Sequence, residues 1–185
     1  EIFMNLLFLI IIGFLFVIIA FTIIFVIILR DQMFINVPFV STRKRALTKI
    51  IKLLNLSKES VLYDLGCGDA RILIEAVRHV PGINAVGIEF GILPFLSAKI
   101  HTCRIPVQIK FGNILNSNLS QATHIYCYLS SPLMKKMKSK IKNECGIGTR
   151  IVSCDYQFPN WKPIETISIE TNNDQLAKTL YLYTK

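Results

Sequence analysis

The residues best suited to binding a small ligand surround two glycines, in the stretch Val61-Leu-Tyr-Asp-Leu-Gly-Cys-Gly-Asp-Ala-Arg71. A glycine turn after a strand lets backbone N–H groups approach a ligand closely. A dinucleotide-binding turn has the pattern G-x-G-x-x-G, and its third glycine would fall at position 71, where this chain has arginine. Asp64 also stands two residues before the first glycine, and a carboxylate there disfavours an anionic pyrophosphate. The stretch therefore favours a ligand that carries positive charge.

Two further polar residues are expected at the same edge of a sheet. Glu89 ends the next expected strand, where a carboxylate can accept hydrogen bonds from both hydroxyls of an adenosine ribose. Asn113 follows the third strand, and its amide can donate to and accept from the edge of an adenine. S-adenosylmethionine combines an adenosine with an ammonium and a sulfonium and carries no phosphate, so it fits this set. We predict that it is bound by Asp64, Gly66, Cys67, Gly68, Glu89 and Asn113.

The elements that must position these residues alternate between strands and helices. Strands are expected at residues 61–65, 85–89, 107–111, 124–129 and 149–154, and the final two at 164–170 and 179–184. Helices are expected from 41 or 42 to 54, and at 70–80, 93–103 and 132–143. This order predicts an α/β fold with a seven-stranded, mostly parallel, Rossmann-like sheet and a C-terminal β-hairpin. Ligands of such sheets bind at the carboxyl ends of the strands, where the strand order reverses.

The N-terminal segment has a different character. From Ile2 to Leu29 there is no charged residue, and about 20 apolar residues suffice to cross a bilayer. A signal peptide would have a basic start, an apolar run of about 7–15 residues and a small-residue cleavage site. This segment instead starts with Glu1, and its apolar run is about twice as long. We therefore expect one transmembrane helix. The predicted division is a transmembrane anchor at 1–30, a linker and N-terminal helix at 31–60, and a ligand-binding domain at 61–185.

The charges predict how this anchor is oriented. All 21 Lys and Arg residues and 11 of the 12 acidic residues lie from Arg30 onward, which gives that part 21 − 11 = +10. Basic residues stay on the cytoplasmic side, so the domain is expected there, at a bacterial cell membrane. A mitochondrial inner membrane is the alternative, less favoured because no Arg- and Ser-rich transit segment precedes the anchor. We also hypothesise that Arg43-Lys44-Arg45 lies against anionic headgroups.

Taken together, these motifs resemble the class I S-adenosylmethionine-dependent methyltransferases over residues 41–185. A narrower resemblance rests on the membrane helix, Val37-Pro-Phe-Val-Ser-Thr42, D-L-G-C-G-D-A-R-I and Phe158-Pro-Asn-Trp161. These are similar to the single-pass protein-lysine methyltransferases related to the enzymes acting on the mitochondrial ADP/ATP carrier and the ATP synthase c subunit. That group usually has P-F/Y-V-P-T and D-L-G-S-G-D-G-R, so Ser41, Cys67 and Ala70 replace a proline, a serine and a glycine. The resemblance implies a methyltransferase fold and lysine N-methylation.

We therefore predict a membrane-anchored enzyme that transfers a methyl group from S-adenosylmethionine to a nitrogen, namely a protein lysine side chain. The anchor suggests a membrane-embedded protein substrate and contacts with lipid. Two alternatives stay open: a methyltransferase for a small or lipid-like acceptor, and a non-catalytic nucleotide-fold module tethered to the membrane. Residues 128–132 lack the [DN]-P-P-[YF] tetrapeptide of enzymes that methylate adenine amino groups, so nucleic acid is not expected as a partner. The five cysteines are widely spaced without C-x-x-C, so neither disulfides nor a metal site are expected.

Tyr128, at the end of the fourth expected strand, and Asp69, after the glycine turn, are the candidate catalytic residues. A lysine must lose its proton before it attacks a methyl group, because its pKa is about 10.4. An apolar channel near the sulfonium would favour the neutral amine, and we expect Tyr128 and Asp69 to line it. Tyr128 could instead belong to the core, and Asp69 could cap the following helix. Glu89 is expected at an open pocket rim, so that Glu89→Gln weakens cofactor binding and changes folding little.

Overall fold

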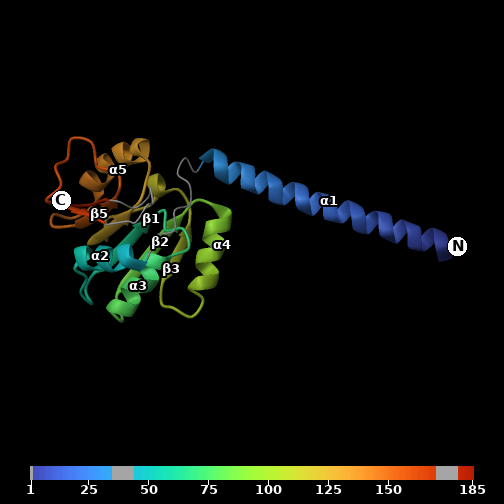
Figure 1. Cartoon of the computed structure of the whole chain (residues 1–185), viewed down its shortest axis with the longest axis horizontal. Coiled ribbons are helices and arrows are strands. Elements are labelled where there is room, and N and C mark those ends of the chain that lie inside the picture. The colour runs from blue at the N-terminus through green and yellow to red at the C-terminus, as the bar shows by residue number, and fades with distance from the viewer. Residues whose placement is uncertain (1, 35–43, 170–178) are drawn as a thin grey trace. The chain divides into compact units, whose positions relative to one another are not determined.

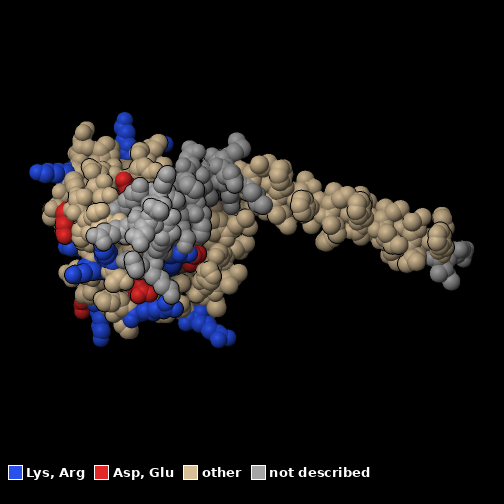
Figure 2. Space-filling view, viewed as in Figure 1, with Lys and Arg blue, Asp and Glu red and all other residues tan. Residues whose placement is uncertain are grey.

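The computed structural model describes residues 2–34, 44–169 and 179–185, in two compact units, Glu1–Asn36 and Val37–Lys185. The first unit contains one helix, α1 (Ile2–Phe34), as Figure 1 shows. Its segment Phe3–Ile27 is 25 residues long and apolar enough to cross a membrane, and this stretch shows no charged side chain in Figure 2. The motif at 37–42, Arg43 and the last residue of the strand expected at 164–170 lie outside the described residues.

The second unit is built on a seven-stranded sheet with the order β3-β2-β1-β4-β5-β7-β6. Its first five strands in chain order are parallel, and β7 lies antiparallel between β5 and β6. The predicted α/β fold class is confirmed. The strands are β1 (Val61–Leu65), β2 (Asn84–Glu89), β3 (Gln108–Phe111), β4 (His124–Cys127), β5 (Arg150–Cys154), β6 (Glu165–Ser168) and β7 (Thr179–Thr184).

Helices cover both faces of this sheet (Figure 1). Leu62 packs on one face with α2 (Lys44–Leu54), α3 (Arg71–His79) and α4 (Ile92–His101). Its neighbour Tyr63 packs on the other face with α5 (Ser131–Glu144) and the short 3-10 helix η1 (Ile114–Asn116). This alternation follows from the two-residue period of a strand, which sends successive side chains to opposite faces. Because both faces are covered, ligand access is left to the edge where the parallel strands end.

Aromatic rings fill the gap between α5 and the sheet. The rings of Phe158, Trp161 and Tyr183 lie with centroids 5.1–5.4 Å apart. Lys142 of α5 places its ammonium 5.1 Å from the centre of the Trp161 ring, within cation–π distance. Lys138 donates hydrogen bonds to two carbonyls of the same segment, those of residues 159 and 160. The Phe158–Trp161 motif therefore fastens the segment after β5 onto α5.

Candidate active site

The site is built at the carboxyl ends of β1, β2 and β4, where the strand order reverses between β1 and β4. Leu65, the last residue of β1, stands level with Ile88 of β2 and with Cys127 of β4. The residues that follow these three strands are therefore neighbours in space, although they are far apart in the sequence. This is where we expected the ligand site.

The glycine turn after β1 is held against β2. The N–H groups of Gly66 and Cys67 donate to the carbonyl of Ile88, at 2.9 and 3.2 Å. Gly66 and Gly68 have φ values of 78° and 57°, which side chains rarely tolerate, so glycine suits both positions. A Cβ added at Gly87 of β2 would lie 2.7 Å from the Cys67 sulfur. The turn and the strand thus approach each other as closely as a glycine allows.

The side chain of Cys67 packs in the core, which is not where a side chain that contacts the cofactor was expected. Its thiol is buried in the core between α3 and β2, beside Leu73. Burial raises the pKa of this thiol strongly, and the carboxylates of Asp64 and Glu89 raise it further. The side chain is therefore neutral and directed into the core.

Glu89 is held by the backbone around it. Its Oε2 accepts a hydrogen bond from the N–H of Gly68 at 2.9 Å, and its Oε1 accepts from the N–H groups of Phe90 and Gly91 at 2.9 and 2.8 Å. The residue is only 7% exposed. The expectation of an open rim is therefore wrong, because this carboxylate is buried and joins the glycine turn to the start of α4. Of its roughly four acceptor sites, these bonds leave one, on Oε2.

Asp64 lies near two other acidic side chains, Glu89 and Asp69. It is 2% exposed, and burial raises its pKa well above the usual range, with the charges of Glu89 and Asp69 raising it further. A carboxylate buried beside two others is costly unless a cation compensates it. An ammonium or sulfonium group would supply that compensation. The cluster therefore suits the positively charged ligand that the sequence predicted.

Asp69 forms an ion pair with Arg71 at the start of α3. Arg71 Nε donates to Asp69 Oδ1 at 2.8 Å. Burial alone would raise the pKa of Asp69, but the hydrogen bonds and the charge of Arg71 outweigh it and lower the pKa. The residue at the cap of α3 is Ala70, and it makes no side-chain capping hydrogen bond. The alternative role of Asp69 as a cap holds in part, because Asp69 is not the N-cap residue but its carboxylate accepts a hydrogen bond from the backbone N–H of Arg71, the first residue of α3. Its part in an acceptor channel stays a prediction.

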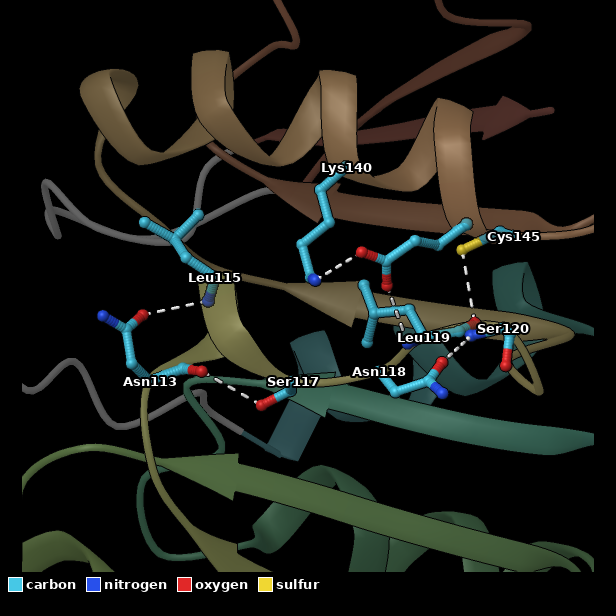
Figure 3. Close-up of polar contacts among 9 residues, drawn as sticks. Asn113, Leu115, Ser117, Asn118, Leu119, Ser120, Lys140 and Cys145 are labelled. Carbon is cyan, nitrogen blue, oxygen red and sulfur yellow. Dashed lines mark hydrogen bonds and ion pairs between the residues drawn. The ribbon is translucent and has the colours of Figure 1, made fainter.

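Asn113 is exposed after β3, and its side-chain oxygen accepts from the N–H of Leu115 at 2.9 Å, as Figure 3 shows. This bond caps η1, an element that the sequence analysis missed. The amide NH₂ of Asn113 remains able to donate to an adenine.

Two aromatic rings lie near the ends of β2 and β3: the rings of Phe90 and Phe111 are within 7° of parallel, with centroids 6.5 Å apart. They directly follow β2 and end β3, so their place beside Glu89 and Asn113 could have been noticed in the sequence.

Tyr128 meets a partner that the sequence analysis did not identify. Its hydroxyl donates to Asp155 Oδ2 at 2.6 Å, and Asp155 Oδ1 accepts from the N–H of Thr179 at 3.0 Å. Asp155 directly follows β5 and has a left-handed φ of 57°. The alternative of Tyr128 as a core residue holds only in part, because it is half-buried and packs against the core. The pair lies at the same edge of the sheet as the glycine turn.

Comparison with known proteins identifies the family. Residues 64–165, more than half of the chain, match the family described as the ANTKMT methyltransferase domain. The chain belongs to this family. A protein-lysine N-methyltransferase of Saccharolobus islandicus is 31% identical over 152 residues, which cover 80% of this chain and 93% of that protein. The adenine nucleotide translocase lysine N-methyltransferase of Mus musculus is 25% identical over 150 residues, which cover 77% of this chain and 63% of the mouse protein.

A solved structure of similar fold carries the product form of the cofactor. An RNA methyltransferase from Salinibacter ruber, crystallised with S-adenosyl-L-homocysteine, matches with a TM-score of 0.72 and 29% identity. The match covers 78% of this chain and 93% of that one. This member of the ANTKMT methyltransferase domain family is an S-adenosylmethionine-dependent methyltransferase, and the predicted cofactor is confirmed. The roles of individual residues toward the cofactor stay predictions.

Proposed function

We propose that this methyltransferase transfers a methyl group from S-adenosylmethionine to the side-chain amine of a lysine in a protein. The observation that carries the proposal is the match, over 80% of the chain, to a relative named as a protein-lysine N-methyltransferase. The mouse relative is named as a lysine N-methyltransferase of the adenine nucleotide translocase. The chain spans 63% of that relative's length, so its protein acceptor is part of the proposal.

The donor is held by charge and by the backbone of the glycine turn. Asp64 faces the ammonium of the methionine part, which relieves the cost of its burial beside two other carboxylates. The remaining acceptor site on Glu89 Oε2 takes one ribose hydroxyl. The rings of Phe90 and Phe111 offer apolar faces to the adenine. S-adenosylmethionine supplies a methyl group on a sulfonium, which a neutral amine attacks in line.

The acceptor amine is positioned by the Tyr128–Asp155 pair. The Tyr128 hydroxyl donates a hydrogen bond to Asp155, and a phenol oxygen can also accept an N–H of the incoming amine. This contact would turn the nitrogen lone pair toward the methyl group, and such orientation supplies much of the rate of a displacement. The Asp155 carboxylate also attracts the ammonium form of lysine to the site before it loses its proton.

The chain acts from a membrane, with α1 as its anchor. The support is the apolar segment Phe3–Ile27, whose length and composition match a bilayer span. The excess of Lys and Arg after this segment favours the cytoplasmic side for the catalytic domain. A bacterial cell membrane is preferred, with the mitochondrial inner membrane as the alternative.

Transfer of label from methyl-labelled S-adenosylmethionine tests the function. Membranes are incubated with the purified full chain, and label is followed into protein, lipid and RNA, with hydrolysed protein analysed for methylated lysine. We expect label in methyl-lysine. Label in lipid would favour the lipid-like acceptor, label in RNA would favour an RNA acceptor like that of the Salinibacter enzyme, and no transfer at all would favour a non-catalytic module. The Asp64→Asn variant, expected to hold the cofactor weakly, is the control.

A further inference from the structure

Helix α4 presents large apolar side chains to its outer face. Leu93, Leu96 and Ile100 are 46%, 49% and 70% exposed. The neighbouring helix α3 differs, because its outer positions Arg78 and His79 are charged or polar. Exposed apolar side chains scattered singly are ordinary, but a contiguous set marks a contact surface.

The three residues form one stripe along the helix. At 100° per residue, they fall within roughly 60° of arc on the helical wheel. The opposite side of the helix carries Ala98 and, directly after the last turn, Thr102, and both are buried. Leu93, Leu96 and Ile100, which we call the α4 stripe, are therefore in excess of what the fold needs for its core.

The surroundings of the α4 stripe are basic. Three cations, Lys99, Arg104 and Lys110, are exposed within or just after α4 and on the adjacent strand β3. The sequence from residue 91 to residue 111 contains no Asp or Glu. An apolar helix face flanked by cations is the combination that binds the interface of an anionic bilayer. A nucleic acid would bind the cations but would not bury the exposed apolar surface of the leucines and the isoleucine.

We propose that the α4 stripe lies in the headgroup region of the anionic bilayer that α1 spans. The inference rests on the proposed anchor, since the segment Phe3–Ile27 is what keeps a bilayer within reach of the domain. Helix α4 begins directly after Gly91, whose N–H bonds to Glu89. Contact through the α4 stripe therefore holds the cofactor edge of the sheet near the membrane surface. A lysine at that surface, rather than one far out in solution, is then the accessible class of acceptor.

Depth-dependent quenching tests the contact in the full chain. Among the described cysteines, Cys103 is exposed while the other four are buried, so a Cys103→Ser background leaves no readily labelled thiol. A nitrobenzoxadiazole probe is attached through Leu96→Cys in this background. The matched control carries the probe through Ser139→Cys, an exposed position of α5 on the opposite face of the sheet. Both proteins are reconstituted into phosphatidylcholine vesicles, with or without phosphatidylglycerol, that contain a spin-labelled lipid.

We expect a blue-shifted emission and spin-label quenching at position 96, strongest with phosphatidylglycerol, and neither effect at position 139. Loss of the quenching on adding Ile100→Glu would support the same contact. A blue shift at position 96 without quenching would mean that protein, such as a second copy, covers the α4 stripe, and would overturn the proposal. Emission that is neither quenched nor shifted, in protein that stays with the vesicles and binds S-adenosylmethionine, would overturn the contact of the α4 stripe but leave the anchor and the methyltransferase assignment intact. Release of the chain from the vesicles would overturn both the anchor and the contact, while leaving the methyltransferase assignment intact.

Discussion

At the scale of single residues, Glu89 supports the fold and is predicted to bind the cofactor. In the Glu89→Gln variant one carboxylate oxygen becomes an NH₂ group, which cannot accept from the backbone N–H groups that Glu89 now satisfies. We expect S-adenosylmethionine affinity to fall at least about tenfold, because charge-assisted hydrogen bonds contribute roughly 1.5–3 kcal/mol each. We also expect the free energy of unfolding to fall by about 1–3 kcal/mol. Calorimetric titration and chemical denaturation measure the two effects.

A matched control separates binding from general loss of stability. Glu144 also accepts a backbone hydrogen bond, from the N–H of Leu119 at 3.0 Å, but it lies beside Lys140 and Cys145, among the contacts drawn in Figure 3. Glu144→Gln should lower stability slightly and leave cofactor affinity unchanged. Undiminished affinity in Glu89→Gln would refute the ribose assignment.

Asp64 should make cofactor binding depend on pH. Its raised pKa means that the folded protein keeps a proton there to a higher pH than the unfolded chain does, whose pKa is about 3.9. Its contribution to stability is therefore present below about pH 4 and is lost as pH rises through the raised pKa. Binding of a cation requires the charged form, so affinity should fall as pH is lowered through that same pKa. In Asp64→Asn we expect a more stable domain at neutral pH that binds S-adenosylmethionine at least about tenfold more weakly.

Two measurements across pH decide this point. Thermal unfolding without cofactor gives the stability, and calorimetric titration gives the affinity, for Asp64→Asn beside the unchanged chain. Affinity that does not depend on pH in the unchanged chain would show that Asp64 does not face the positive charge of the cofactor.

Tyr128 should act on the acceptor and not on the donor. Tyr128→Phe removes the hydroxyl that lies 2.6 Å from Asp155. We expect kcat/KM for the acceptor to fall at least about tenfold, with unchanged S-adenosylmethionine affinity, because a positioned hydrogen bond is lost in the transition state. Tyr183→Phe is the matched control: its hydroxyl accepts from the N–H of Phe158 at 3.2 Å inside the aromatic cluster. That variant should lose roughly 0.5–1.5 kcal/mol of stability and keep its kinetics; equal kinetic losses in both variants would argue against the positioning role.

At the scale of elements, the turn into α3 shows how a departure from the family pattern is tolerated. Ala70 stands where the related enzymes usually have glycine, and its φ is 64°. This conformation costs an alanine about 1–2 kcal/mol. Burial of the Ala70 methyl group offsets about 0.8 kcal/mol of this cost. A glycine would also raise the entropy of the unfolded chain and so lower the stability of the fold by about 0.5–1 kcal/mol. The opposing contributions nearly cancel.

We therefore expect Ala70→Gly to change the free energy of unfolding by less than about 0.5 kcal/mol. Gly66→Ala should behave differently. Its φ of 78° is equally unfavourable for a side chain, and its new methyl group would gain only an ordinary contact, 3.4 Å from Leu129. A loss of about 1–2 kcal/mol is expected there. Urea denaturation of both variants is the measurement, and a stabilised Ala70→Gly protein would show that strain outweighs burial at position 70.

The elements themselves were predictable where local pattern decides them. The strand expected at 61–65 is β1, and the strand expected at 85–89 is β2 with one residue added, because short apolar runs between turns specify buried parallel strands. The helix η1 was missed because three residues are too few for a helical period. Asp155 was missed for another reason: it meets Tyr128 only because β4 and β5 are neighbours in the sheet. The inward direction of the Cys67 thiol likewise depends on the absence of a side chain at Gly87.

At the scale of the whole molecule, two units of opposite character share one chain. The segment Phe3–Ile27 is apolar throughout, whereas the part from Arg30 onward carries the whole excess of positive charge. A bilayer accounts for both features, since its hydrocarbon core accepts the first and its anionic surface attracts the second. The proposed function depends on both contacts, because a fragment without α1 would lose the proposed position beside a membrane-bound acceptor.

The anchor is tested by placing charge within α1. Ile11 and Ile18 lie well inside the apolar segment, and a lysine near the centre of a spanning helix costs about 2.5–3.5 kcal/mol on insertion scales. We expect the unchanged chain to stay in the membrane pellet after alkaline carbonate extraction. The double variant Ile11→Lys, Ile18→Lys should be released, while Ile11→Leu, Ile18→Leu should behave like the unchanged chain. Both variants should bind S-adenosylmethionine normally, because the donor site lies wholly in the other unit. Equal retention of the lysine variant would mean that α1 does not cross the bilayer, and that the domain must reach its acceptor by another route.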